Sequence, residues 1–406
     1  MSVVPTSLLG VGHSAPAPDT ELRALRARPA EQQPSWPDHT ALAAVREELG
    51  AAPDLVTGAE IDELRGMLAG VAEGRLRVLQ AGDCAEDPAH ATAEHVARRA
   101  EMLASLGDVM SERSGRPVVL AGRLGGQFAK PRSQPTEVRD GCELPAFRGH
   151  LVNGPEFDAR TRVPDPRRLL AGYRAAADVV EALRRGRPAA GELNSPRVWT
   201  SHEALVLDYE LPLLRRQDDD LILTSTHWPW VGERTRRLDG AHVHLLSRIR
   251  NPVACKVGPA MTANELVALC ERLDPRREPG RLTLIIRLGA SLVSTRLPEL
   301  VTAVRRAGHP VIWLCDPMHG NTFRGARGRK SRLVGSLIRE VLGFHAAVRG
   351  EQGVAGGLHL EATPEDVVEC VLDETELAEL PDGTEPLCDP RLNTDQARLV
   401  ATAWPG

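Results

Sequence analysis

The sequence has few aromatic residues and no long apolar run. Phe, Trp and Tyr make up only 3% of the 406 residues, so a core must be filled mainly by Leu, Val, Ile and Ala, as suits helices packed on a buried sheet. No stretch approaches the roughly 20 apolar residues of a membrane span. Residues 1–18 lack a basic segment followed by an apolar one, so no secretory signal is predicted. We therefore expect a cytoplasmic protein without membrane contact.

The spacing of cysteines and glycines excludes several common sites. The seven cysteines are scattered and show no CxxC or zinc-finger spacing, which indicates reduced thiols and not a disulfide framework. The glycines of residues 121–126 do not have GxGxxG or P-loop spacing, so they are interpreted as turn formers. A formal net charge of −5 gives no reason to expect nucleic acid as a partner.

From residue 76 onward, short apolar runs alternate with longer amphipathic segments, which is typical of a parallel sheet with helical crossovers. Eight candidate strands follow one another at residues 76–81, 118–123, 198–201, 221–225, 253–257, 282–287, 311–315 and 357–361. This order predicts an α/β fold, a closed (β/α)₈ TIM barrel. An open doubly wound sheet would produce much the same pattern.

The predicted domains are an N-terminal part at residues 1–75 and the catalytic barrel at residues 76–406. Residues 11–40 are rich in Pro, Ala and Arg and have no period, so we expect an irregular arm there. Residues 41–49 and 61–72 have apolar side chains at helical spacing, which predicts an N-terminal helical extension. Its apolar helices could cover a subunit interface, so we expect a homo-oligomer.

Three pairs of residues signal the start of helices within the barrel. Asp165-Pro166 and Thr363-Pro364 each place a capping side chain before a helix-compatible proline. Thr262 and Glu265 have capping-box spacing. We therefore predict helices that begin at each of these positions.

Charged side chains follow the predicted strands, whose ends form the catalytic face of a parallel barrel. One set is cationic and would bind phosphates and a carboxylate: Arg123, Lys130, Arg132, Arg234, Lys256 and Arg287. A second set offers a thiolate, an imidazole and two carboxylates, which suit a divalent transition metal: Cys84, His319, Glu361 and Asp389. Any one of these residues could be a packed thiol, a helix cap or a surface charge. Their joint placement favours a metal-dependent enzyme that handles phosphates.

Several motifs resemble those of type II, or plant-type, 3-deoxy-D-arabino-heptulosonate 7-phosphate (DAHP) synthases. They extend almost to the C-terminus, at residues 80–86 (QAGDCAE), 129–133 (AKPRS), 201–205 (SHEAL), 230–236 (WVGERTR), 316–321 (DPMHGN) and 388–393 (CDPRLN). Residues 33–38 (QPSWPD) are similar to the family's N-terminal arm. The resemblance implies condensation of phosphoenolpyruvate with erythrose 4-phosphate, which releases inorganic phosphate and opens the shikimate pathway.

The resemblance also implies roles for individual residues. The positions that match the family's metal ligands are Cys84, His319, Glu361 and Asp389. We expect Mn²⁺ or Co²⁺ there, with Fe²⁺ or Zn²⁺ as alternatives. The positions that match its phosphoenolpyruvate contacts are Arg123, Glu233, Arg234, Lys256 and Arg287, and the catalytic candidates among them are Lys256, Arg287 and Glu233. Lys130, Arg132 and Ser133 match the loop that receives the aldose phosphate.

Two positions depart from the family's pattern. His150 stands where many relatives have an acidic residue, and Ala290 stands where Asn is usual. Because of these differences, an amino or imino analogue of erythrose 4-phosphate is an alternative acceptor substrate. An alternative of another class is a catalytically silent barrel that regulates a partner such as chorismate mutase. The intact metal and cation sets disfavour it.

Two features bear on regulation. The connection at residues 186–197 is short, whereas feedback-regulated relatives carry additional helices there. We predict that the internal aromatic amino-acid site is absent, which would suit an enzyme that feeds specialised metabolism. Cys388 adjoins the proposed ligand Asp389. One hypothesis is that it forms a reversible disulfide with Cys84, and the alternative is that it is an ordinary buried thiol.

Overall fold

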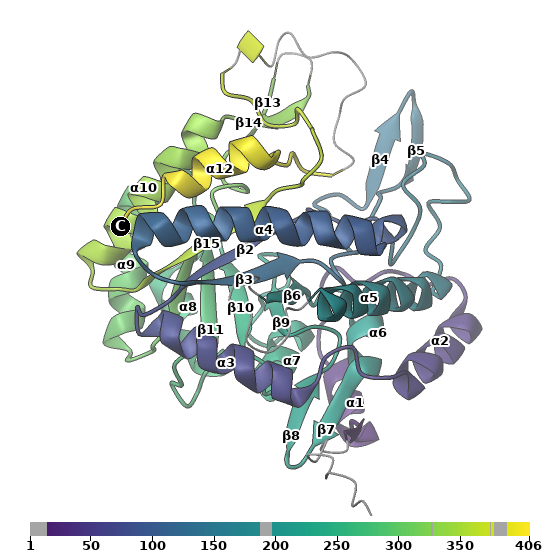
Figure 1. Cartoon of the computed structure of the whole chain (residues 1–406). Helices are drawn as coiled ribbons and strands as arrows, with labels where there is room; N and C mark the ends of the chain where they lie inside the picture. The colour runs from purple at the N-terminus through teal and green to yellow at the C-terminus, as the bar shows by residue number, and fades with distance from the viewer. Residues whose placement is uncertain (1–13, 187–196, 326–327, 374, 377–387) are drawn as a thin grey trace, which may run out of the picture.

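The computed structural model describes residues 14–186, 197–325, 328–373, 375–376 and 388–406, and a closed barrel of eight parallel strands forms its centre (Figure 1). In the order of their hydrogen bonding, the strands are β10 (Val253–Val257), β11 (Leu282–Ile286), β12 (Ile312–Cys315), β15 (Ala355–Glu361), β2 (Arg77–Gly82), β3 (Val118–Arg123), β6 (Val198–Glu203) and β9 (Trp228–Val231). The predicted (β/α)₈ class is confirmed.

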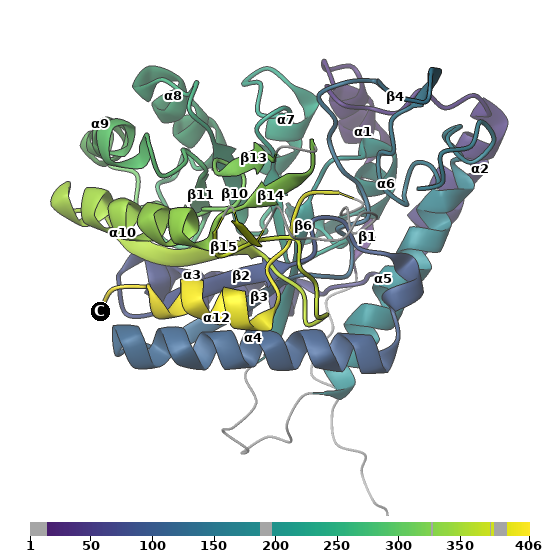
Figure 2. The same cartoon turned by 90° about the horizontal axis from the view of Figure 1, so that it is seen from above.

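Helices follow the strands and surround the barrel (Figure 2). They are α4 (Ala93–Ser114), α5 (Arg167–Arg185), α6 (Leu207–Glu210), α7 (Ala241–Arg248), α8 (Ala263–Leu273), α9 (Val293–Arg306), α10 (Val334–Gly350) and α12 (Thr394–Thr402), with 3₁₀ turns η1 (Pro88–His90) and η2 (Leu211–Leu213). Their apolar faces pack on the outside of the strands in a core made mostly of Leu and Val. None of the described helices combines the length and the hydropathy needed to cross a membrane.

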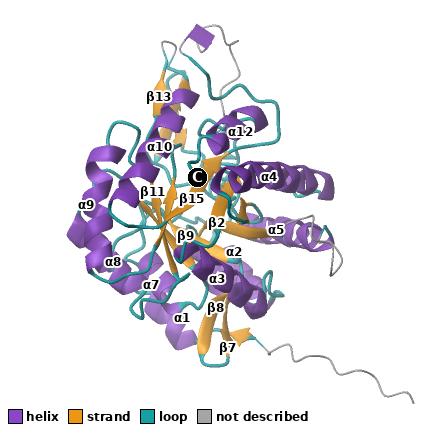
Figure 3. Cartoon of the chain, turned by 60° about the vertical axis from the view of Figure 1, so that its left-hand side comes forward, coloured by secondary structure: helices purple, strands orange, loops and turns teal. Residues whose placement is uncertain are grey.

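The N-terminal part adds α1 (Asp19–Arg26), α2 (His39–Ala51) and α3 (Gly58–Ala72). Thr57 and Glu60 form a capping box at the start of α3. The buried face of α3, which includes Leu64 and Leu68, packs with residues at the beginning of the barrel strands such as Val78. Helix α3 therefore covers the end of the barrel where the strands begin, and it lies beside the strands in Figure 3. The opposite end is left for the site.

Two hairpins and a small sheet elaborate the barrel. The hairpins are β4 (Thr136–Arg139) with β5 (Cys142–Pro145), and β13 (Thr322–Arg324) with β14 (Lys330–Arg332). They follow β3 and β12, and both lie in the upper part of Figure 1. The sheet joins β1 (Ala15–Pro16), β7 (Leu214–Gln217) and β8 (Asp220–Leu223) in antiparallel order. Because the two hairpins extend from strand ends, they can deliver side chains to the catalytic face.

The predicted fourth barrel strand at residues 221–225 is wrong. That segment forms β8, which pairs with β7 outside the barrel. The barrel position is taken by β9, which pairs with β6 and β10 and contains Pro229 between two buried tryptophans. The prediction failed because the apolar run at residues 221–225 is more typical of a buried strand than β9 is. Pro229 lies inside β9, and a proline inside a strand argues against a barrel position.

Two smaller predictions also need correction. The arm expected to be irregular at residues 11–40 contains β1 and helix α1. No helix begins at Thr363-Pro364, where the chain runs from β15 into bends. By contrast, α5 follows Asp165-Pro166 directly, and Thr262 with Glu265 caps α8 as predicted.

Candidate active site

A pocket opens at the carboxyl ends of the barrel strands. Its lining consists of Cys84, Arg123, Gln127, Lys130, Pro131, Glu203, Trp230, Gly232, Glu233, Arg234, Lys256, Arg287, His319, Glu361 and Asp389. The four predicted metal ligands therefore meet in one place. Five of the six predicted cations join them there, and only Arg132 does not line the pocket.

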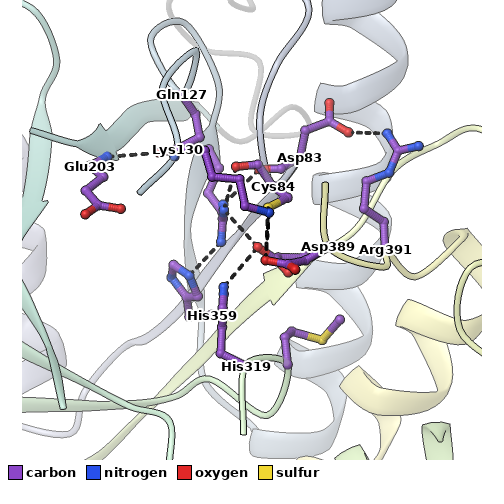
Figure 4. Close-up of polar contacts among 12 residues, drawn as sticks. Asp83, Cys84, Gln127, Lys130, Glu203, His319, His359, Asp389 and Arg391 are labelled. Atoms are coloured by element: carbon purple, nitrogen blue, oxygen red, sulfur yellow. Dashed lines mark hydrogen bonds and ion pairs between the residues drawn. The ribbon is translucent and has the colours of Figure 1, made fainter. Parts of the chain in front are cut away.

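Three of the four predicted metal ligands form a compact cluster, and the fourth, His319, contacts one of them (Figure 4). One donor atom each from Cys84, Glu361 and Asp389 lies within 4.8 Å of the others. The Cys84 sulfur is 3.7 Å from Oδ2 of Asp389, and Nε2 of His319 is 3.1 Å from Oε1 of Glu361. A thiolate, an imidazole and two carboxylates this close together fit a divalent transition metal.

Asp316 orients the imidazole of His319. Its Oδ2 lies 2.8 Å from Nδ1 of the ring, which leaves Nε2 facing Glu361. Burial tends to raise the pKa of Asp316, but His319 and Lys256 hold it well below the ordinary value. A carboxylate behind the other ring nitrogen is the usual support for a metal-binding histidine, because it fixes the tautomer and the ring direction.

The carboxylate of Glu361 is fully buried and surrounded by cations. Nη2 of Arg123 is 3.2 Å from Oε1, and Nη1 of Arg332 is 2.8 Å from Oε2. Burial favours the neutral acid, but the cationic neighbours, with His319 first among them, keep the pKa of Glu361 well below its ordinary value. The residue is therefore ionised and ready to act as a ligand.

Two lysines contact the second carboxylate, that of Asp389. Nζ of Lys130 is 2.8 Å from Oδ2 and 3.3 Å from the sulfur of Cys84, as Figure 4 shows for the carboxylate contact. Lys330, from hairpin strand β14, lies 3.2 Å from Oδ1. Burial tends to raise the pKa of Asp389, but Lys130 lowers it below the ordinary range. These contacts keep Asp389 charged beside the thiol.

Lys256, Arg287 and Glu233 line the pocket close to the donor cluster. Nζ of Lys256 is 3.1 Å from Asp316, and burial lowers the pKa of this lysine. Within the part of the chain that the structure describes, the buried Nε of Arg287 has no hydrogen-bond partner. The buried Oε2 of Glu233 has none there either, while its Oε1 pairs with Arg236 at 2.8 Å. A donor left without a partner in a pocket is suited to a bound anionic group.

Of the three residues expected to receive the aldose phosphate, Lys130 lines the pocket, whereas Arg132 and Ser133 do not. Lys130 points into the pocket, whereas Ser133 is exposed and the guanidinium of Arg132 pairs with Glu137 of strand β4. His150, which motivated the alternative acceptor, does not line the pocket. The pKa of His150 is lowered by burial, and its charged neighbours include Asp87 and Arg168.

Several residues of the site were not singled out by the sequence analysis. Gln127, Glu203 and Trp230 line the pocket, and Arg332 and Lys330 contact the carboxylates. Glu203 and Trp230 lie in the motifs SHEAL and WVGERTR that the sequence shares with the family, so the sequence could have placed them in the site. Nothing in the sequence could have placed Lys330 and Arg332 in the site, because they lie well after strand β12 in the chain.

The barrel and its strand-end pocket, which joins a metal-type donor cluster to a group of cations, define an enzyme that handles phosphorylated substrates. Comparison with known proteins narrows this class. The model of the class-II DAHP synthetase family matches residues 20–188 and 180–403. The chain is 51% identical over 375 residues to a probable phospho-2-dehydro-3-deoxyheptonate aldolase of Pseudomonas fluorescens, an alignment that covers 92% of this chain and 94% of the relative.

Two further relatives carry the name phospho-2-dehydro-3-deoxyheptonate aldolase. The protein of Streptomyces coelicolor is 40% identical over 92% of this chain and 94% of its own length. The AroG protein of Mycolicibacterium smegmatis is 38% identical over 92% of each chain. The chain therefore belongs to the class-II DAHP synthetase family. This confirms the resemblance and the prediction of an enzyme of the 3-deoxy-7-phosphoheptulonate synthase class.

Glu340 of α10 ties together two loops that carry site residues. Its Oε1 accepts a hydrogen bond from the Gly289 amide at 2.7 Å, and its Oε2 accepts one from the Asn321 side chain at 2.5 Å. The Gly289 loop follows Arg287, and Asn321 follows His319. Burial raises the pKa of Glu340 to about 8. At neutral pH this side chain therefore holds a proton that the unfolded chain would release.

We predict that Glu340→Gln makes the melting temperature less dependent on pH. Because the pKa of Glu340 rises from 4.5 to about 8 on folding, its contribution to stability is complete below pH 4.5 and is lost as the pH rises toward 8. The melting temperature of the unmodified protein, measured by scanning calorimetry, should fall relative to that of the variant across this interval. The exposed control Glu112→Gln should change nothing. Parallel curves for the unmodified protein and Glu340→Gln would contradict the prediction.

Proposed function

We propose that this protein is a metal-dependent synthase that condenses phosphoenolpyruvate with erythrose 4-phosphate to give DAHP and inorganic phosphate. One observation carries the proposal. The donor cluster of Cys84, Glu361 and Asp389 opens into the same pocket as Lys256 and Arg287. A cation group beside a Lewis-acid site matches two anionic substrates, one of which presents a carbonyl. The names of the three relatives support the same reaction.

Phosphoenolpyruvate would lie against Arg234, Lys256 and Arg287. The Nε of Arg287, which has no partner among the described residues, and the exposed residue Arg234 can donate to phosphate or carboxylate oxygens. Lys256 is held by Asp316 and supplies a buried point charge. These cations orient the enol phosphate and offset the repulsion between two anionic substrates.

The aldehyde would lie at the donor cluster, between Cys84 and Asp389, with His319 and Glu361 completing the ligand set. When bound, the divalent ion supplies a Lewis acid that polarises the aldehyde carbonyl. Lys130 contacts both Cys84 and Asp389, and the nearby anionic groups raise its pKa above the ordinary value although burial opposes this. It therefore stays protonated and can donate to the aldehyde oxygen as negative charge develops there.

Carbon three of the enol phosphate attacks the aldehyde carbon, and positive character develops at carbon two. Water adds to carbon two, and the bond from carbon two to the phosphate oxygen then breaks to leave a ketone and inorganic phosphate. Glu233 is our candidate base for the attacking water, because its Oε2 has no partner among the described residues. Its Oε1 is fixed by Arg236, so the free oxygen has a defined direction.

The first experiment measures phosphate release from phosphoenolpyruvate with erythrose 4-phosphate and Mn²⁺ or Co²⁺, with and without a chelator. We expect activity that the chelator abolishes and added metal restores. Cys84→Ala should lower both metal affinity and kcat/KM by about 100-fold or more, because a ligand is lost. Cys142→Ala, at an exposed thiol of β5, is the matched control and should behave as the unmodified protein.

Three results would overturn this proposal or parts of it. Activity that the chelator does not affect would remove the metal. A higher kcat/KM with an amino or imino analogue of erythrose 4-phosphate would replace the acceptor, and no phosphate release with any aldehyde would favour the silent barrel.

We also propose that aromatic amino acids do not inhibit this enzyme. Residues 186–197 are all that connects α5 with β6, and residues 187–196 of that connection lie outside the described part of the chain. Phenylalanine, tyrosine and tryptophan, alone and in pairs, should leave the rate of phosphate release unchanged at millimolar concentration. Strong inhibition by any of them would contradict the absence of an internal site.

Cys388 directly precedes Asp389, whose Oδ2 is 3.7 Å from the sulfur of Cys84, and the neighbouring Cys388 thiol raises the pKa of Cys84, so we propose that mild oxidation joins the two cysteines. A two-electron oxidant such as diamide would take two electrons and two protons from the thiols and form one S–S bond, which removes a donor from the metal cluster. We expect reversible loss of activity, restored by a dithiol, and Cys388→Ser should resist it. Peptide mapping that finds no linkage between these cysteines after oxidation would exclude the switch.

A further inference from the structure

The N-terminal arm between α1 and α2 is attached to the catalytic end of the barrel. The side-chain amide of Gln33 donates to the carbonyl of Leu205 at 2.8 Å and accepts from the amide of Leu207 at 2.9 Å. Trp36 donates from Nε1 to Asp208 at 2.7 Å. The arm is thus fixed to the segment that follows strand β6, far from it in the sequence.

This attachment places Gln32 against the loop of the predicted acceptor residues. Oε1 of Gln32 accepts a hydrogen bond from the backbone amide of Arg132 at 2.9 Å. The carbonyl of Gln32 accepts one from Nη2 of Arg148 at 2.6 Å. The carbonyl of Arg148 in turn accepts from the amide of Lys130 at 2.9 Å. Both cations of the loop therefore have their backbone held, one by the arm and one by Arg148.

Gln32 makes this contact from a strained backbone. Its φ is 61°, in the left-handed region where residues with a side chain are uncommon and cost free energy. In the neighbouring Gln33, both the nitrogen and the oxygen of the side-chain amide are hydrogen-bonded, so the chain has little freedom to relax at Gln32. Such a conformation persists where the surroundings impose it, and here it aims Oε1 at the Arg132 amide.

The surroundings of Gln32 suit an anion. Arg132 and Arg148 both contact Gln32, and the pKa of Arg148 is lowered by burial and further by repulsion from Arg132. The third cation of this region, Lys130, lines the pocket. Lys130 and Arg132 each pair with a carboxylate, but Arg148 contacts none among the described residues, so this part of the loop keeps a positive charge that suits a phosphate.

We propose that Gln32 is a positioning residue for the acceptor: it holds the Lys130–Arg132 backbone so that Lys130 faces the aldehyde while Arg132 can receive the phosphate group of the aldose phosphate. This inference rests on the proposed function. It assigns a role to the arm itself, since an amide side chain can accept from a backbone amide without competing as an anion for the neighbouring arginines.

Gln32→Gly tests the inference, because glycine tolerates the left-handed backbone while the acceptor oxygen is lost. We expect the KM for erythrose 4-phosphate to rise about fivefold to tenfold, as suits the loss of one hydrogen bond. The KM for phosphoenolpyruvate and the affinity for Mn²⁺ should change less than about twofold. Hydrogen exchange should become faster in the peptide that contains Arg132.

Gln352→Gly is the matched control. Gln352 also has a left-handed backbone, with φ 59°, and its Oε1 also accepts from an arginine, Arg305, at 3.1 Å. It lies in the connection between α10 and β15 and does not line the pocket. Both variants relieve the same backbone strain, so an effect of strain alone would appear in both.

The outcomes separate this inference from the proposed function. If the unmodified protein releases no phosphate with erythrose 4-phosphate, the proposed function fails and this inference fails with it. If the unmodified protein is active and Gln32→Gly raises both substrate KM values equally, or neither, the inference alone is wrong. Faster exchange at Arg132 without any change in the acceptor KM would also overturn it, because the held backbone would then have no role in binding.

Discussion

The buried charge of Glu361 is the constraint on which the site depends. An isolated carboxylate without access to water would carry a large desolvation cost, so it must be surrounded by cations. Arg123 from β3, Arg332 from β14 and His319 after β12 all lie within 3.2 Å of its oxygens. Removing any one of them leaves the charge partly uncompensated. One carboxylate therefore holds three separate segments of the chain in a single arrangement.

The order of the barrel strands divides the site residues into two groups, one on each half of the barrel's carboxyl-end rim. Strands β15, β2 and β3 are neighbours, and they lead to Glu361, Cys84 and Arg123 on the metal side. Strands β10, β11 and β12 are also neighbours, and they lead to Lys256 and Arg287 on the anion side. Because β12 is next to β15, the loop that carries His319 lies where the halves meet. The pairing of Asp316 with both Lys256 and His319 therefore couples the two halves of the rim.

Much of the barrel could be predicted from the sequence because buried parallel strands have apolar runs at regular intervals. The same rule predicted the position of Cys84, Lys256 and Arg287, which lie at or just after strand ends. It failed at β9, where Pro229 weakens the pattern and the preceding apolar run belongs to the antiparallel strand β8. Thr363-Pro364 has the residues of a helix start, but no helix forms there. A start signal is not enough, because a helix also needs an apolar face that packs against the core.

The contacts that could not be predicted come from segments inserted between the barrel elements. In the sequence, Arg332 has the pattern of a solvated surface charge, and only the folding of the β13–β14 hairpin brings it to Glu361. Gln32 likewise reaches Arg132 across 100 residues of chain. Within the donor cluster, Cys84 and Glu361 lie at or just after strand ends, which the barrel fixes, whereas Lys130 and Arg132 lie in a loop that the N-terminal arm contacts. Arms and loops tolerate sequence change better than barrel strands do. Under the proposed function, the loop that receives the acceptor can therefore vary in sequence while Cys84 and Glu361 keep their places at the strand ends.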